Sequence, residues 1–271
     1  MKYHIVSVCI GSTKYEPIEP HFVKRINERC PNAIVNIIKF IPDNIKDDFI
    51  HNIFNENIDS YGWWDVLRLN KIINLLETEK IPVVHCDMDI IIEKDIQKLI
   101  DIPYDLIYSK EFGENNAFPG YCSEIIGFGL CTGFSIIKPT ENSIKFLKKL
   151  YDNMINKLYK TYSDQITLMN MITNSKYSIS NKFFIENNFI FNNKIISLTD
   201  DNINICVLDY DLIIRDPEYT KNQFANHLNL DNVGGTNDLI KYYYNKLEDL
   251  PLTCRCGKLG NTDICTHRKK L

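Results

Sequence analysis

The sequence predicts an α/β fold in which a mostly parallel central sheet is flanked by helices and followed by a short Cys-rich tail. Short apolar runs of strand composition alternate with longer stretches of helical spacing, which is typical of such sheets. Polar residues follow directly after several of these runs, at the strand ends where ligands gather. With 271 residues and no internal repeat, the chain can bury a substantial core, and we expect one domain at residues 1–250 and a tail at residues 251–271.

The first five predicted elements are three strands and two helices. Residues 3–10 form a β-rich apolar run that ends at a Gly-Ser turn. Residues 21–30 have apolar side chains at helical spacing and stop at a proline, and residues 33–41 alternate before running apolar. Residues 61–80 again have helical spacing, and the apolar residues 81–85 follow as a buried strand.

The later elements continue the alternation. We predict a short helix at residues 94–100, a strand at residues 105–109, a Gly- and Asn-rich loop at residues 113–121 and a strand at residues 128–138. Amphipathic helices are expected at residues 142–157 and 164–173.

Composition limits the classes of function. A net charge of −4 and a pI near 5.9 argue against a nucleic-acid partner. No apolar run reaches the roughly 20 residues of a membrane helix, and the start MKYHIVSVCIGS is typical of a strand and not of a signal peptide. Six scattered cysteines indicate reduced thiols, so we expect a soluble, cytoplasmic protein. The bias towards Asn, Ile and Lys indicates an AT-rich genome, such as that of a large virus or a bacterium.

Two aspartates follow the buried strand in the stretch PVVHCDMDIII. Asp87 and Asp89 lie two residues apart, so in an extended chain their side chains point the same way. Two like charges beside apolar residues repel and lose hydration, which is costly unless a cation lies between them. Carboxylates in this arrangement suit Mg²⁺ or Mn²⁺. The alternative is a solvated turn at the strand end.

The stretch VVHCDMDIII resembles the D-x-D strand of nucleotide-diphospho-sugar glycosyltransferases with the Rossmann-like GT-A fold, in which a divalent ion bridges the aspartates and the donor diphosphate. The motifs are intermediate between a glycogenin/galactosyltransferase-like group and a mannosyl- and toxin-glucosyltransferase-like group. Further stretches resemble family motifs in the same order along the chain: KYHIVSVCIGSTKY, WWDVLRLNKI, FGLCTGFSIIK, YSDQITLMN and FANHLNLDNVGG.

The resemblance implies a role for each motif. Asp87, Asp89 and His227 would hold Mn²⁺ or Mg²⁺, and Asp164 and Gln165 would be the catalytic pair over the reacting sugar. Besides the two aspartates, the residues expected to bind the donor are Cys9, Ile10, Gly11, Ser12, Tyr15, Asp65, Arg68, Met88, Thr132, Gly133, Gly234 and Gly235.

Residue chemistry leaves structural alternatives open for two motifs. Asp65 and Arg68 share a helix face at i, i+3, so an exposed ion pair would also explain them. The sequence Ser163-Asp164-Gln165 equally fits the N-cap and first turn of a helix.

The implied activity is that of a metal-dependent hexosyltransferase. It would move a sugar from a nucleotide-diphosphate donor, a UDP-sugar rather than a GDP-sugar, to a hydroxyl of a glycan or protein. The Asp-Gln pattern favours retention, since inversion needs a carboxylate that deprotonates the acceptor. The alternatives are an aspartyl-phosphate phosphohydrolase, in which the first Asp is the nucleophile, a sugar-1-phosphate nucleotidyltransferase, and a non-catalytic sugar-binding protein.

The tail at residues 251–271 is a separate question. Its ligand set Cys254, Cys256, Cys265 and His267 has the composition of a tetrahedral structural zinc site, with a disulfide or free thiols as the alternatives.

Overall fold

The computed structural model describes residues 1–10, 15–40, 63–111, 119–159, 161, 163–186, 189–214 and 223–228. The predicted tail and its boundary at residue 250 lie outside these ranges. The same holds for the candidate zinc ligands Cys254, Cys256, Cys265 and His267.

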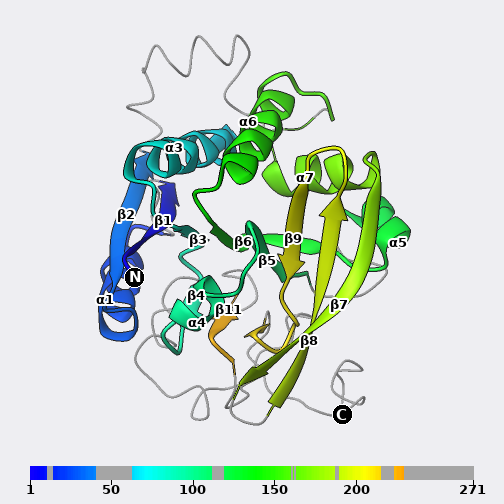
Figure 1. The fold of residues 1–271 in the computed structure, drawn as a ribbon. Helices are drawn as coiled ribbons and strands as arrows, with labels where there is room; N and C mark the ends of the chain where they lie inside the picture. The colour runs from blue at the N-terminus through cyan, green and yellow to red at the C-terminus, as the bar shows by residue number, and fades with distance from the viewer. Residues whose placement is uncertain are drawn as a thin grey trace, which may run out of the picture.

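Eight strands form the central sheet, in the order β2-β1-β3-β6-β5-β9-β8-β7 (Figure 1). β1 is parallel to β2 and β3, β5 is parallel to β9, and β6 is antiparallel to both β3 and β5. β8 is antiparallel to β7 and β9, so six of the eight described strands run in one direction. The strands are β1 Tyr3–Ile10, β2 Ala33–Phe40, β3 Val83–Cys86, β5 Leu106–Lys110, β6 Leu130–Ile137, β7 Tyr177–Glu186, β8 Phe189–Leu198 and β9 Ile203–Val207.

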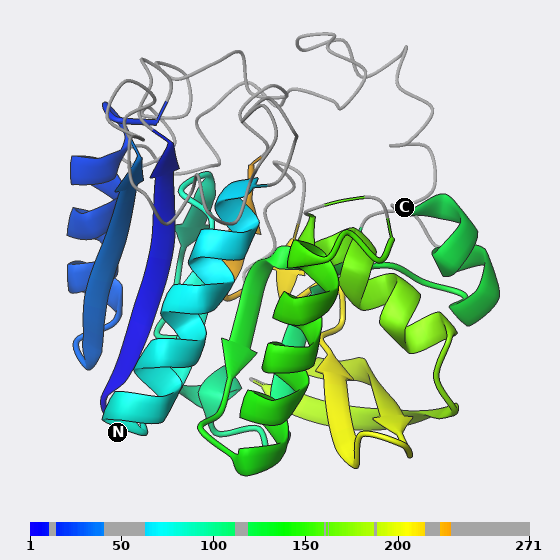
Figure 2. The same cartoon turned by 90° about the horizontal axis from the view of Figure 1, so that it is seen from above.

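Helices cover both faces of this sheet, and each face has its own hydrophobic cluster (Figures 1 and 2). One cluster holds residues of α3, α5, α6 and α7, and the other holds residues of α1, α4 and a small second sheet with the order β10-β11-β4. The helices are α1 Glu19–Arg29, α3 Trp63–Glu79, α4 Gln97–Ile100, α5 Gly120–Ile126, α6 Glu141–Ile155 and α7 Asp164–Thr173; the short strands are β4 Ile90–Ile92, β10 Ile213–Ile214 and β11 Ala225–His227.

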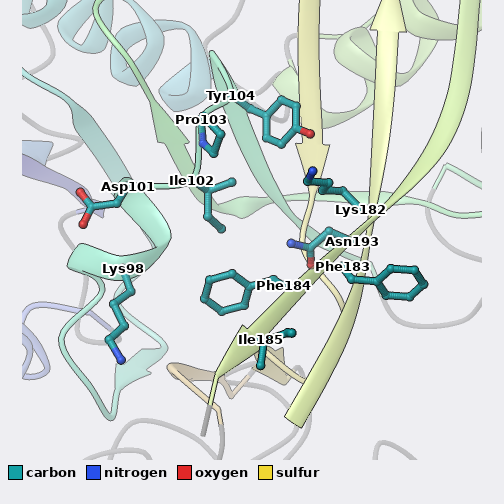
Figure 3. A pocket seen from close by; sticks show the side chains of 10 residues that line it. All are labelled: Lys98, Asp101, Ile102, Pro103, Tyr104, Lys182, Phe183, Phe184, Ile185 and Asn193. Atoms are coloured by element: carbon teal, nitrogen blue, oxygen red, sulfur yellow. The ribbon is translucent and has the colours of Figure 1, made fainter. Parts of the chain in front are cut away.

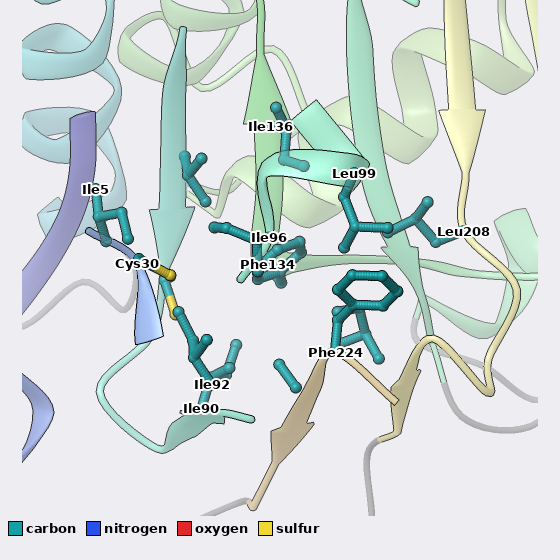
Figure 4. Close-up of a cluster of buried hydrophobic side chains, with 14 of the residues drawn as sticks. Ile5, Cys30, Ile90, Ile92, Ile96, Leu99, Phe134, Ile136, Leu208 and Phe224 are labelled. Atoms are coloured by element: carbon teal, nitrogen blue, oxygen red, sulfur yellow. The ribbon is translucent and has the colours of Figure 1, made fainter. Parts of the chain in front are cut away.

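Alternation along the strands feeds both clusters. In β1, Ile5 packs into the cluster with α1, and the next residue, Val6, packs into the cluster with α3. Figure 4 shows the cluster on the α1 side of the sheet, where Phe134 from β6 and Phe224, just before β11, come together beside α4. The small sheet is therefore fixed to the central sheet by buried apolar contacts.

The small sheet matters because β4 begins directly after the predicted metal motif. Arg25 of α1 binds β4 through its Nε, which donates to the Ile92 carbonyl at 2.9 Å, and through an ion pair with Glu93 at 2.6 Å. On the other side β4 pairs antiparallel with β11, with Ile90 opposite His227. β4 is thus held from two sides directly after the chain leaves the central sheet.

The predicted α/β class is confirmed, and most predicted elements lie within a few residues of the observed ones. Most of the predicted loop at residues 113–121 lies outside the described residues, and its last two residues begin α5, which ends at Gly127 in a left-handed conformation with φ of 81°. The antiparallel hairpin β7–β8, the strand β9 and the small sheet are elements that the sequence did not predict. Among the described helices, none combines the length and apolar character needed to cross a bilayer.

Leucine truncation should separate core from surface on the sheet face that α3 covers. Leu76 is fully buried on α3, so Leu76→Ala should lower the free energy of unfolding by about 2–5 kcal/mol, because it removes apolar contacts and leaves a cavity. Leu158, with 59% of its surface exposed after α6, is the matched control, and Leu158→Ala should cost less than about 0.5 kcal/mol. Urea unfolding of both variants measures the difference; equal costs would contradict the described packing.

Candidate active site

The candidate site lies where β1 and β3 end. These two strands are parallel neighbours, so their carboxyl ends meet at one edge of the sheet. Asp87 follows β3 directly, and Asp89 lies in the turn that leads to β4, closed by the Ile90 amide donating to the Asp87 carbonyl at 3.1 Å. The expectation of an extended chain between the two aspartates is therefore wrong, because here the chain leaves the central sheet for the small one.

The turn nevertheless brings the two carboxylates together with the predicted histidine. Ligand atoms of Asp87, Asp89 and His227 all lie within 4.8 Å of one another. His227 comes from β11, more than a hundred residues along the chain, and its Nε2 lies 3.3 Å from Asp89 Oδ1. Asp89 and His227 are buried, whereas the Asp87 side chain is 37% exposed and forms the open side of the cluster.

The donor set fits a divalent cation. Asp89 Oδ1 is buried and has no hydrogen-bond partner of good geometry among the described residues, which is costly unless another group satisfies it. Gly133 of β6 makes room for the Asp87 and His227 side chains, since a Cβ there would lie 2.6 Å from Asp87 Oδ2 and 2.7 Å from His227 Cε1. Two carboxylates and one imidazole are a ligand set that suits Mn²⁺. The set suits Mg²⁺ less well, because Mg²⁺ prefers oxygen to nitrogen ligands.

Charges around the cluster set its protonation. Burial raises the pKa of Asp87, but hydrogen bonding and charge from His85, with the charges of Arg68 and His227, outweigh it and lower that pKa, so the carboxylate is ionised. Burial lowers the pKa of His227, but Asp89 and Cys131 raise it to about 10. A metal ion at this position would compete with the proton that His227 otherwise carries.

A second group of charges is centred on Arg68, from the first turns of α3. Its Nη2 lies 2.9 Å from Asp65 Oδ1 and 2.5 Å from Asp164 Oδ2, and its Nη1 lies 3.7 Å from Asp87 Oδ1. Arg68 and Asp65 are only 5% and 7% exposed, so the alternative of an exposed surface pair is wrong. Burial raises the pKa of Asp65 against the attraction of Arg68. Burial lowers the pKa of Arg68, but the three carboxylates together outweigh it and raise that pKa.

The predicted catalytic pair starts helix α7. Ser163 is its N-cap and accepts from the Ile166 amide at 3.5 Å, so the capping alternative holds as well. Asp164 Oδ1 accepts from Thr132 Oγ1 at 2.9 Å, and Gln165 Oε1 accepts from the Thr132 amide at 3.5 Å. Both side chains therefore meet β6 at the same residue, next to Gly133.

A bulge in β6 makes this meeting possible. Tyr108 of β5 pairs with Ser135, but the next residue, Ser109, pairs with Cys131, so the three intervening residues of β6 have no partner in β5. Bulges of this kind bend a strand and redirect its side chains, and they occur frequently beside active sites. Thr132 and Gly133 lie in the bulge, between the two groups of charges.

Other predicted donor residues lie less directly at the site. The Cys9 and Met88 side chains are buried in the hydrophobic cluster of α1, and Tyr15 packs against that cluster, so Cys9 and Met88 offer only backbone groups to a ligand. Ile10 ends β1 four residues past Val6, the last residue of β1 that pairs with β3. Gly11, Ser12, Gly234 and Gly235 lie outside the described residues.

Three residues of the site were missed in the sequence. His85 Nδ1 lies 2.7 Å from the Thr132 carbonyl, and His85 Nε2 lies 3.1 Å from Asp87 Oδ1. Glu111 is buried at the end of β5 and accepts from Gln165 Nε2 at 3.3 Å. Cys131 Sγ lies 3.7 Å from His227 Nδ1. His85 could have been found, because a histidine two residues before Asp87 in a buried strand points to the same side.

A cavity of about 390 Å³ lies elsewhere, between the end of α4 and the β7–β8 hairpin (Figure 3). Tyr104 and Phe184 contribute rings to its wall, and Lys98 and Lys182 lie at its rim. None of the residues predicted from the sequence lines it. The cavity is therefore distinct from the candidate site.

Comparison with known proteins agrees with the geometry. The sequence model of the nucleotide-diphospho-sugar transferase family matches residues 24–244. Among curated proteins no sequence matches the chain.

Solved structures support the fold. The apo form of the glycosyltransferase GlyE from Streptococcus pneumoniae TIGR4 has a TM-score of 0.52 and 11% identity, over 92% of this chain and 61% of GlyE. A second GlyE structure gives 0.52 and 12%, over 91% and 62%. A complex of the galactosyltransferase LgtC with donor and acceptor sugar analogues has 12% identity and a TM-score of 0.42, over 62% of this chain and 70% of LgtC. The likeness to GlyE confirms the GT-A-like fold, and this chain spans about three fifths of the length of GlyE.

Gly133→Ala tests the closeness of the cluster. The added Cβ would overlap Asp87 Oδ2 and His227 Cε1, so it should displace both side chains and weaken Mn²⁺ binding by at least about 10-fold. Gly120→Ala is the matched control, because a Cβ there has no atom within 4 Å. Calorimetric titration with Mn²⁺ measures both; unchanged affinity in Gly133→Ala would contradict the described arrangement.

Proposed function

Since this chain belongs to the nucleotide-diphospho-sugar transferase family, we propose that it is a metal-dependent glycosyltransferase that moves a sugar from a nucleotide-diphosphate donor to a hydroxyl of a glycan or protein. The observation that carries the proposal is the convergence of Asp87, Asp89 and His227 from two distant segments, next to the buried group of Arg68 and Asp164. A structural role would not require so many unlike charges at one open edge of a sheet.

Asp87, Asp89 and His227 would hold the ion, Mn²⁺ or Mg²⁺. When bound, the ion neutralises the negative charge that develops on a departing nucleoside diphosphate. Asp87 is the most exposed of the three, so the diphosphate would approach from its side. Gly133 has no side chain, which makes room for Asp87 and His227 to lie against the backbone of β6.

Asp164 and Gln165 would orient the donor sugar. Asp164 is fixed at both oxygens, by Arg68 at Oδ2 and by Thr132 at Oδ1, so it presents a rigid carboxylate to the sugar hydroxyls. Gln165 is held between the Thr132 amide and Glu111. Rigid groups of this kind raise the rate because no reorganisation is needed at the moment of reaction.

Arg68 contributes differently from what its sequence position suggests. Two carboxylates already occupy its Nη2, so it serves to hold Asp164 and offset the charge of Asp65 and Asp87, not to offer a free cation to the diphosphate. The positive charge that offsets the departing diphosphate would thus come from the metal ion.

Donor and stereochemistry follow from the resemblance of the motifs. A UDP-sugar is the preferred donor over a GDP-sugar, and the Asp164-Gln165 pattern favours retention of the anomeric configuration. Family membership disfavours the phosphohydrolase and the sugar-1-phosphate nucleotidyltransferase alternatives. A non-catalytic sugar-binding protein is the remaining alternative, and it would bind the donor without cleaving it.

Donor hydrolysis without acceptor tests the proposal. The wild-type chain should release UDP from at least one member of a UDP-sugar panel in the presence of Mn²⁺ and release no phosphate from a phosphomonoester. Asp89→Asn should weaken metal binding, so the positive charge of the ion that stabilises the leaving group would be lost. The rate should fall by at least about 100-fold, a barrier increase of about 2.7 kcal/mol. Asp200→Asn is the matched control, an exposed aspartate in the turn after β8, and should keep the wild-type rate.

Two outcomes would contradict the proposal. Binding of UDP-sugars without cleavage of any of them, in the presence of Mn²⁺ and an acceptor panel, would support a non-catalytic protein. Phosphate release from a phosphomonoester that depends on Asp87 would support the phosphohydrolase.

A further inference from the structure

Cys131 differs from the other described cysteines. Five of them, Cys9, Cys30, Cys86, Cys122 and Cys206, are buried within one of the two hydrophobic clusters. Cys131 is just as buried, at 3% exposed, but belongs to neither cluster. Its Sγ lies 3.7 Å from Nδ1 of His227, within the reach of a sulfur hydrogen bond. Its sulfur therefore contacts a residue of the candidate metal site.

The imidazole of His227 is enclosed on several sides. Nε2 faces Asp89 Oδ1 at 3.3 Å, and Nδ1 faces Cys131 Sγ at 3.7 Å. Cε1 lies only 2.7 Å from the position that a Cβ on Gly133 would occupy. The backbone of this segment is held by the pairing of His227 with Ile90. Backbone and ring are thus fixed from independent directions.

We propose that Cys131 is a positioning residue for metal binding by His227. This inference rests on the proposed function, since it assigns a role within the same metal site. A ring that binds a metal through Nε2 must carry its proton on Nδ1, and metal-binding histidines almost always donate that proton to a second group. Here the acceptor is the Cys131 sulfur, which is a weak acceptor and lies on the side of the ring away from Asp89.

The thiol itself stays outside the ligand set. His227 faces Asp89 through Nε2, at 3.3 Å, whereas Cys131 lies at Nδ1 on the other side of the ring. The site therefore keeps the oxygen-rich character that suits Mn²⁺ and Mg²⁺, although a cysteine lies in contact with one ligand.

Mn²⁺ titration of the full chain, without nucleotide, tests the role. Cys131→Ala removes the acceptor and should weaken Mn²⁺ binding about 10–100-fold, as is typical when the second partner of a metal-binding histidine is lost. Cys131→Ser restores an oxygen that accepts the same proton and should recover most of the affinity. Cys122→Ala, which removes a buried thiol that contacts Thr173 on α7, should leave the affinity unchanged.

A purely structural role predicts a different pattern. It would lower the melting temperature of both Cys131 variants in proportion to lost packing and would not separate Ser from Ala in Mn²⁺ affinity. Equal affinity of Cys131→Ala and wild type, or no recovery in Cys131→Ser, would overturn the proposal. If the alanine variant does not fold, Cys131→Val replaces it, since it fills the same space without accepting a proton; it should bind Mn²⁺ as weakly.

Cobalt substitution gives a second readout. With Co²⁺ in the wild-type chain, we expect no intense thiolate-to-metal absorption, because Cys131 does not ligate; such a band would overturn the proposal. A wild-type chain that binds Mn²⁺ but cleaves no UDP-sugar would contradict the proposed function and leave the Cys131 result standing. A wild-type chain that binds no Mn²⁺ would overturn both.

Discussion

Two carboxylates at one corner of the sheet create the constraint that organises this protein. Asp87 and Asp89 lie close together, and one of them, Asp89, is almost fully buried with an oxygen that no hydrogen bond of good geometry satisfies among the described residues. Like charges in such a place are unfavourable unless positive groups surround them. Arg68 of α3 and His227 of β11 supply that charge, and His85 of β3 lies 3.1 Å from Asp87 Oδ1.

The fold delivers these groups by two departures from regular structure. The chain leaves the central sheet at Asp87 and enters the small sheet at Ile90, which turns Asp89 towards β11. The bulge in β6 places Thr132 and Gly133 between the cluster of Asp87, Asp89 and His227 and the start of α7. Because each departure is fixed by pairing on both sides, the ligands are held before any ion or donor binds, which favours tight and oriented binding.

Much of this arrangement could be predicted from the sequence because the signals are local. The apolar run before Asp87 and the helical spacing around Arg68 each identify an element and the residue at its end. His227 and Asp164 could be paired with them only through the resemblance to a family, since no local pattern shows which distant segments meet. No local pattern indicates β7, β8 and β9, since their exposed apolar side chains and short alternations are weak signals. The bulge could not be predicted either, because it depends on pairing between strands.

The central claim is that Asp87, Asp89 and His227 share one divalent ion with the diphosphate of a donor. The most direct measurement is a crystal structure of the full chain with Mn²⁺ and UDP, with data collected to locate manganese by its anomalous scattering. We expect a single strong peak in contact with all three side chains, and the diphosphate on the Asp87 side. Bound UDP with no manganese at these residues, or manganese bound elsewhere, would contradict the account.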